Sequence, residues 1–104
     1  MYKNSPLISV IINCHNGEKY LEKSVRSVIR QTYKNWEIIF WDNRSTDNSK
    51  KIIKSFNDKR IKYFKSKKYS TLYKARNIAI KKAKGKYIAF LDTDDWWYKT
   101  KLEE

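Results

Sequence analysis

The sequence has 104 residues, which is long enough for one domain with its own hydrophobic core. Hydrophobic residues make up 40% of it and aromatic residues 15%, which argues against a disordered chain despite the high charge. The formal net charge of +13 favours contact with phosphates, nucleic acid or anionic lipid headgroups. A single cysteine excludes an internal disulfide, and no apolar run approaches the roughly 18 residues of a membrane span.

Apolar runs alternate with helical patterns along the whole chain. In chain order we predict a strand at 7–12, a helix at 18–31, a strand at 36–41, a helix at about 47–56, a strand at 61–64, a helix at 71–84 and a strand at 86–91. Gly85 follows the third helix and is expected to cap its C-terminus. The almost continuous apolar run of the last strand is typical of a parallel strand covered on both faces.

This alternation predicts an α/β fold. Strands that alternate with helices form right-handed crossovers and a mostly parallel, Rossmann-like sheet with helices on both faces. If the sheet is doubly wound, the first three strands extend it one way and the fourth returns beside the first. The expected strand order is therefore 3-2-1-4, and we expect residues 1–104 to form a single domain.

Polar clusters follow three of the predicted strands, at residues 13–17, 42–45 and 92–95. In the expected strand order all three meet at one edge of the sheet, where open α/β sheets bind ligands. Asp92, Asp94 and Asp95 repel one another unless a cation compensates their charge. Taken alone, this acidic segment could equally be a solvated turn that caps a following helix. The convergence of the three clusters favours a ligand site.

The composition restricts the kind of ligand. The chain has only two glycines, Gly17 and Gly85, which excludes both a G-x-G-x-x-G fingerprint and a P-loop. A divalent ion held by carboxylates is the other common way to bind a diphosphate, and hard oxygen ligands suit Mg²⁺ or Mn²⁺. One histidine and one cysteine disfavour a zinc site. The residues therefore predict a metal-assisted diphosphate site.

Several segments occur together in a characteristic order and spacing: residues 8–16, 20–25, 31–39, 41–49, 75–77 and 83–95. Together they resemble family 2 glycosyltransferases over essentially the whole chain. The resemblance implies a GT-A fold and an inverting enzyme that uses a nucleotide-diphosphate sugar and Mn²⁺ or Mg²⁺. It also implies a saccharide or lipid-linked acceptor, in the synthesis of cell-surface polysaccharide, lipopolysaccharide or glycolipid.

The resemblance assigns roles to the acidic segment. Residues 92–94 match the DxD motif of the family, so Asp92 and Asp94 are expected at the nucleotide sugar, and Asp94 or Asp95 at the metal. Arg76 matches the arginine of an A-R-N segment that lies near the nucleotide. A structural alternative for Arg76 is an ion pair with a surface acid.

On the base side, Asn13 and His15 stand where the family usually has a small or hydroxylated residue and a tyrosine. Asp42 and Asn43 match an aspartate pair that contacts the base, and Arg44 replaces a small residue. An asparagine in place of the second aspartate loses a charged acceptor for an imide N–H. These departures put a preference for uracil in doubt more than nucleotide binding itself. Asn43 could alternatively serve only to shape a turn.

Inverting transfer needs a general base that deprotonates the acceptor hydroxyl. In the family resembled, this carboxylate comes from beyond the nucleotide-binding half. We therefore expect residues 1–104 to bind donor without transferring sugar, and to be truncated before the acceptor-binding half. Apolar surface left exposed near Trp96 and Trp97 would favour a homo-oligomer.

The alternative is a basic nucleic-acid- or anionic-membrane-binding module without catalysis. The Lys-rich segment 62–74 motivates it. The acidic cluster would repel a phosphate backbone, so nucleic acid is not expected. Peripheral membrane contact is compatible with a lipid-linked acceptor. We expect a cytoplasmic protein that contacts the inner face of the membrane.

Overall fold

The computed structural model describes residues 6–68 and 71–103, and only the backbone of Leu72 and Tyr73. Residues 69 and 70 of the Lys-rich segment lie outside the described part. The elements in chain order are β1 (Ile8–Cys14), α1 (Glu18–Ile29), β2 (Trp36–Asp42), α2 (Ser49–Ser55), β3 (Ile61–Lys65), α3 (Leu72–Lys82), β4 (Tyr87–Phe90) and the 3₁₀ turn η1 (Lys101–Glu103). None of the described helices is both long and apolar enough to cross a bilayer.

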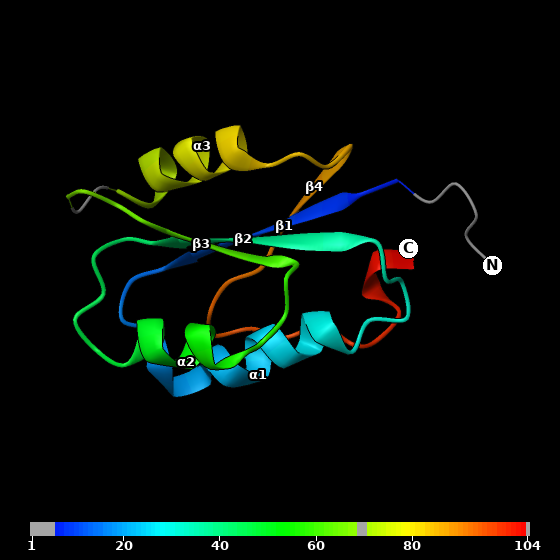
Figure 1. The fold of residues 1–104 in the computed structure, drawn as a ribbon, viewed down its shortest axis with the longest axis horizontal. Coiled ribbons are helices and arrows are strands. Elements are labelled where there is room, and N and C mark those ends of the chain that lie inside the picture. Colours follow the sequence, from blue (N-terminus) through cyan, green and yellow to red (C-terminus); the bar gives the residue numbers. More distant parts are fainter. Residues whose placement is uncertain (1–5, 69–70, 104) are drawn as a thin grey trace.

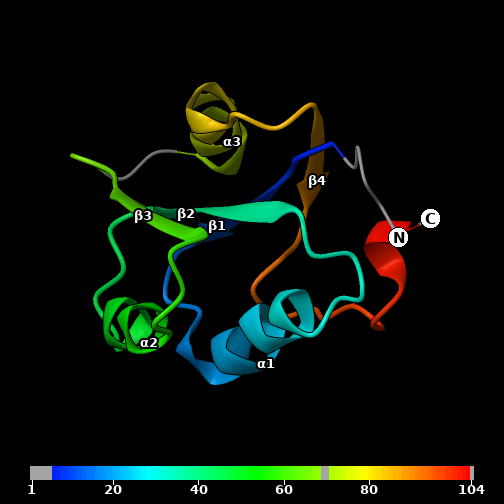
Figure 2. The same ribbon diagram turned by 45° about the vertical axis from the view of Figure 1, so that its right-hand side comes forward.

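The four strands form one parallel sheet in the order β3-β2-β1-β4, as predicted. Helices α1 and α2 cover one face and α3 covers the other (Figures 1 and 2). The chain thus forms a three-layer α/β structure around a Rossmann-like parallel sheet. The carboxyl ends of β1, β2 and β4 meet at one edge of the sheet, which places the polar segments after these strands together.

The two central strands are buried on both faces, because successive side chains of a strand point to opposite sides of the sheet. One core lies between the sheet and the helices α1 and α2, and includes Val10, Ile12, Leu21, Val25, Ile38 and Phe40. The other lies under α3 and consists of Ile11, Ile39, Trp41, Ala75 and Ala79. The small side chains of Ala75 and Ala79, one helical turn apart, face the sheet beneath α3.

The expectation that the last strand is covered on both faces is wrong. In β4 the side chains of Tyr87, Ile88 and Phe90 are 55%, 38% and 44% exposed. Among the described residues β4 pairs only with β1, and α3 packs on β1 and β2 instead. An apolar run shows that a strand is hydrophobic, but not whether it is central or lies at the edge of the sheet.

Gly85 does not cap a helix in the left-handed conformation, so that prediction is also wrong. Helix α3 ends at Lys82, followed by Ala83 in an extended conformation, and no described glycine has a positive φ. Gly85 instead lies against β1, where its N–H donates to Ser9 Oγ at 2.8 Å. A Cβ atom at this position would lie 2.6 Å from Ser9 Oγ and 2.7 Å from Ser9 N. The glycine is needed for close approach.

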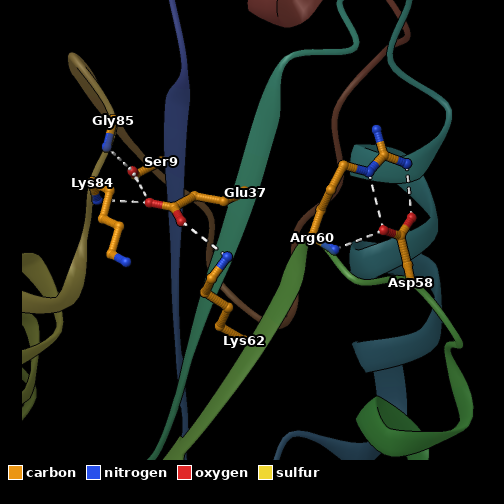
Figure 3. Close-up of polar contacts among 7 residues, drawn as sticks. All are labelled: Ser9, Glu37, Asp58, Arg60, Lys62, Lys84 and Gly85. Atoms are coloured by element: carbon orange, nitrogen blue, oxygen red, sulfur yellow. Dashed lines mark hydrogen bonds and ion pairs between the residues drawn. The ribbon is translucent and has the colours of Figure 1, made fainter.

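The buried carboxylate of Glu37 joins several elements near the amino ends of the strands. Glu37, near the start of β2, is only 3% exposed. Its Oε2 accepts hydrogen bonds from Ser9 Oγ at 2.6 Å and from Lys84 N at 2.7 Å, and its Oε1 lies 3.5 Å from Lys62 Nζ (Figure 3). Burial raises the pKa of Glu37, but these donors outweigh it and leave the pKa lowered. The carboxylate joins β1, β2, β3 and the segment after α3.

Candidate functional site

The segments after β1, β2 and β4 meet through hydrogen bonds at the carboxyl edge of the sheet. Asn43 N donates to Cys14 O at 2.7 Å, which joins the ends of β2 and β1. Asn16 Oδ1 accepts from Thr46 N at 2.7 Å, which joins the two loops beyond them. From the middle of α1, Ser24 Oγ donates to Thr93 O at 2.8 Å. The predicted convergence of the three polar segments is therefore present.

A cavity of about 460 Å³ lies between the segment after β1 and the segment after β4. It is lined by Asn13, Asn16, Gly17, Lys19, Tyr20, Asp92, Thr93 and Asp94. Asn13 Oδ1 is buried and accepts no hydrogen bond from the residues that the structure describes. A Cβ on Gly17 would lie 2.8 Å from Thr93 Oγ1, so a glycine lets the two loops approach. The cavity combines carboxylate, amide and ammonium groups.

The acidic segment is held from two sides. Asp92 Oδ1 lies 3.4 Å from an Nη of Arg76, which α3 supplies. Asp95 Oδ1 accepts from Trp96 N at 2.8 Å, and the Asp95 carbonyl contacts Ser24 Oγ. The structure therefore brings Arg76, Asp92 and Asp94 to one place. Asp95 is exposed beside them, but it does not line the cavity.

Asp42 is buried at the end of β2, with only 1% exposure. Its Oδ1 accepts from Ser45 N at 2.9 Å and its Oδ2 from Tyr63 Oη at 2.5 Å. Burial raises the pKa of Tyr63 above its usual range, and the hydrogen bond to Asp42 adds to the effect. Asp42 thus orders the turn after β2 and does not line the cavity described above.

Asn43 is buried, and its backbone carbonyl oxygen lies 2.7 Å from Nδ1 of the exposed His15. This distance fits a hydrogen bond that the protonated Nδ1 donates. Asn16 and Arg44 have φ values of 56° and 61°, in the left-handed region. Asparagine adopts this conformation readily, whereas an arginine there is less favourable. His15, Asn43 and Arg44 thus form a second group beside the cavity.

Two lining residues lie outside the polar clusters predicted from the sequence: Lys19 and Tyr20. Lys19 and Tyr20 lie in the first turn of α1, which begins directly after the predicted polar turn. Their position relative to that turn is the signal that could have identified them. Lys19 places a cation at the same cavity as Asp92 and Asp94.

The carboxylates of the acidic segment are the candidate ligands for a divalent ion. Within 6–68 and 71–103, no group of three or more His, Cys, Asp or Glu side chains is placed to hold a metal. Mg²⁺ and similar ions at phosphate sites commonly take only one or two carboxylates and complete their coordination with substrate phosphates and water. Asp92 and Asp94 at one cavity supply such a pair. The residues fit a metal that binds together with a diphosphate.

Comparison with known proteins shows the family to which this chain belongs. Residues 9–104 match the family described as Glycosyl transferase family 2. The chain therefore belongs to the family 2 glycosyltransferases, as its motifs and fold indicated.

One relative is the Escherichia coli UDP-Glc:alpha-D-GlcNAc-diphosphoundecaprenol beta-1,3-glucosyltransferase WfgD, 42% identical over 97 residues, which are 93% of this chain and 38% of that protein. S. aureus TarS 1–349 in complex with UDP-GlcNAc has a TM-score of 0.87 and 31% identity, over 92% of this chain and 29% of that one. The Pyrobaculum calidifontis mannosyltransferase PcManGT, solved with GDP-Man and Mn²⁺, shares the fold with a TM-score of 0.82 and 21% identity, over 91% and 29% of the two chains. This chain thus spans well under half of each.

Proposed function

We propose that residues 1–104 bind a nucleotide-diphosphate sugar together with Mn²⁺ or Mg²⁺, as the donor side of an inverting glycosyltransferase. One observation carries this proposal. Asn13, Asp92 and Asp94 line one cavity at the carboxyl edge of β1 and β4, the place where open α/β sheets bind ligands. The similarity to TarS, a protein solved with UDP-GlcNAc, supports the same assignment.

In this proposal the acidic segment holds the diphosphate end of the donor. Asp94, with Asp92 or Asp95, would bind the ion, which supplies positive charge to the diphosphate leaving group. Lys19 adds a cation at the same cavity. Arg76 restrains Asp92 through the 3.4 Å ion pair, and it would lie close to the bound nucleotide.

The nucleoside would lie toward the turn after β2. Asp42 orders this turn through Ser45 and Tyr63, and Asn43 and His15 are held beside each other by their hydrogen bond. We propose that the Asn43 amide faces the base and that the His15 ring packs on it. An amide accepts from an imide N–H less strongly than a carboxylate does, so selection for uracil would be weak.

We further propose that the donated sugar passes to a saccharide or lipid-linked acceptor in the synthesis of cell-surface polysaccharide or glycolipid. The acceptor named for WfgD, a GlcNAc-diphosphoundecaprenol, supports the proposal of a lipid-linked acceptor. Deprotonation of the acceptor requires a positioned general base. We assign only donor binding to residues 1–104, and we place the general base outside them.

A thermal-shift screen of nucleotide-diphosphate sugars with and without Mn²⁺ tests this proposal. A ligand at 100 times its dissociation constant stabilises the native state by about 2.7 kcal/mol, which raises the melting temperature measurably. We expect stabilisation by at least one donor that depends on Mn²⁺. In parallel, the protein is incubated with donors and a panel of acceptors. Absence of any shift would refute donor binding, a shift that is the same without Mn²⁺ would refute the role of the metal, and efficient transfer would refute the restriction to the donor side.

A further inference from the structure

Helix α1 carries a row of cations on its outer face. Lys19, Lys23 and Arg26 are exposed along the helix, and Arg30 follows directly after its last residue. Their spacing of four, three and four residues places all of them on one side of an α-helix. The opposite side, with Leu21, is buried in the core. The row therefore faces solvent.

This row borders a groove of about 650 Å³ between α1 and the segment that follows the acidic loop. The groove is lined by Lys19, Glu22, Lys23, Arg26, Ser27, Arg30, Trp96, Trp97 and Lys99. It holds five cations and a single carboxylate, Glu22, which Arg26 already pairs at 3.0 Å. Figure 2 shows the chain after β4 running beside α1 toward η1. The groove is thus strongly positive along its length.

Exposed aromatic rings lie among these cations. Trp96 is 44% exposed and Tyr20 is 40% exposed, with ring centroids 6.2 Å apart. Lys23 Nζ lies 3.7 Å from the Trp96 ring centroid, a cation–π contact. Tryptophan and tyrosine favour the headgroup level of a bilayer, where the ring is apolar on one side and hydrated on the other.

We propose that this α1 groove is a docking surface for an anionic phospholipid bilayer. A helix whose cations lie along one face, flanked by exposed aromatic rings, matches the chemistry of an interface between water and anionic headgroups. Trp97 lines both this groove and an adjacent apolar one that Tyr87 and Ile88 border, so apolar surface continues beyond the cations. This surface does not require a bound donor.

Charge complementarity favours a bilayer over nucleic acid as the occupant. Asp92, Asp94 and Asp95 lie directly before Trp96 in the chain and are exposed. An extended phosphate backbone that follows the groove would run toward these carboxylates and be repelled. A bilayer plane can contact the α1 row and Trp96 while the carboxylates remain in water.

Co-sedimentation with vesicles tests this surface without nucleotide or metal. We expect binding to vesicles of phosphatidylglycerol and phosphatidylcholine, little binding to phosphatidylcholine alone, and weakening by salt. Trp96 is the most exposed of the tryptophans, so binding should shift the fluorescence emission to shorter wavelength. The shift should be absent in Trp96→Ala, with binding roughly tenfold weaker.

Two matched triple variants separate this surface from general charge. Lys23→Gln, Arg30→Gln and Lys99→Gln remove three cations of the groove, whereas Lys51→Gln, Lys59→Gln and Lys81→Gln remove three exposed cations elsewhere. The groove variant should bind anionic vesicles about a hundredfold more weakly, and the control variant should lose far less. Equal losses in both variants, or no preference for anionic vesicles, would overturn the proposal. So would a groove variant that loses oligonucleotide binding and keeps vesicle binding.

Discussion

Two glycines set how closely neighbouring segments approach at opposite ends of the sheet. At the carboxyl edge, a Cβ on Gly17 would lie 2.8 Å from Thr93 Oγ1 and 3.1 Å from Cys14 Sγ. At the other end, a Cβ on Gly85 would meet Ser9 and the carbonyl oxygen of Leu7 at 2.6–2.8 Å. The partners of Gly85 include backbone atoms of a central strand, which cannot move aside easily.

Substitution of Gly85 tests this explanation. Gly85→Ala should lower the free energy of unfolding by about 2 kcal/mol, because the added methyl group overpacks against β1. Gly85→Asn should be at least as destabilising. A left-handed helix cap would tolerate asparagine, so urea unfolding that shows Gly85→Asn close to the unmodified protein would contradict close approach as the cause.

The buried Glu37 carboxylate predicts a pH dependence of stability. Its pKa in the folded protein is lowered by hydrogen bonds from Ser9 and Lys84 and by Lys62, which outweigh burial. A lowered folded pKa contributes stability above the unfolded value of about 4.3, and this contribution is lost as the pH falls through the folded pKa. Glu37→Gln should therefore lower the free energy of unfolding by about 2 kcal/mol at pH 7. The difference in stability between this variant and the unmodified protein should shrink below about pH 4.3.

Urea unfolding across this pH range measures the effect. The control is Glu22→Gln. Its exposed carboxylate pairs with Arg26 on the same helix, so the change should alter stability by less than about 0.5 kcal/mol at pH 7. A Glu37→Gln penalty that stays constant from pH 7 to pH 3 would show that the charge of Glu37 is not its cause.

At the scale of elements, α1 connects the core to the acidic segment. Its buried residues, including Leu21 and Val25, pack on the sheet, and the hydroxyl of Ser24 contacts the carbonyl oxygens of Thr93 and Asp95. The helix therefore fixes the loop that carries Asp92 and Asp94 relative to β1. Ser27 Oγ donates to Ser24 O within the same helix, and in the described part of the chain it forms no hydrogen bond with that loop.

This difference gives a matched pair of variants. Ser24→Ala should lower stability by about 1 kcal/mol and also weaken metal-dependent donor binding, because two carbonyl groups of the acidic segment lose their donor. Ser27→Ala should have a similar effect on stability and leave donor affinity unchanged. Calorimetric titration measures the donor affinity of both variants. Equal donor affinity in the two would show that the hydroxyl of Ser24 does not contribute to donor binding.

The secondary-structure elements and their order were predictable from the sequence because each element has a distinct pattern of apolar residues. The runs in β1 and β2 are apolar on both faces, and the α1 positions Leu21, Val25 and Val28 repeat at helical spacing. The exposure of β4 was not predictable, since it depends on which strand lies beside it and not on its own residues. The exposed side chains of β4 are consistent with self-association, which stays a prediction.

The site was only partly predictable for a similar reason. Acidic residues after a strand are visible in sequence, and Asp92 and Asp94 do lie at the cavity. Asp42 is buried and accepts a hydrogen bond from Tyr63, which comes from another strand 21 residues away. Likewise, Lys19 reaches the cavity only because α1 begins beside it. Contacts between distant segments cannot be derived from local pattern.

At the scale of the whole molecule, the 3-2-1-4 strand order is what makes a site. It places β4 beside β1, so that Asp92 and Asp94 face Asn13 and the start of α1 across one cavity. The donor cavity and the positive α1 groove share Lys19 and lie next to each other. A donor site beside a membrane-docking surface would suit transfer to a lipid-linked acceptor.

The central claim is that the acidic segment binds a donor diphosphate through a divalent ion. Its most direct test is calorimetric titration of Asp94→Asn with the nucleotide sugar that gives the largest thermal shift. Glu22→Gln, which also removes one negative charge, serves as the control. We predict that donor affinity in Asp94→Asn falls at least tenfold and no longer depends on Mn²⁺, whereas the control behaves as the unmodified protein. Unchanged, Mn²⁺-dependent affinity in Asp94→Asn would contradict this assignment.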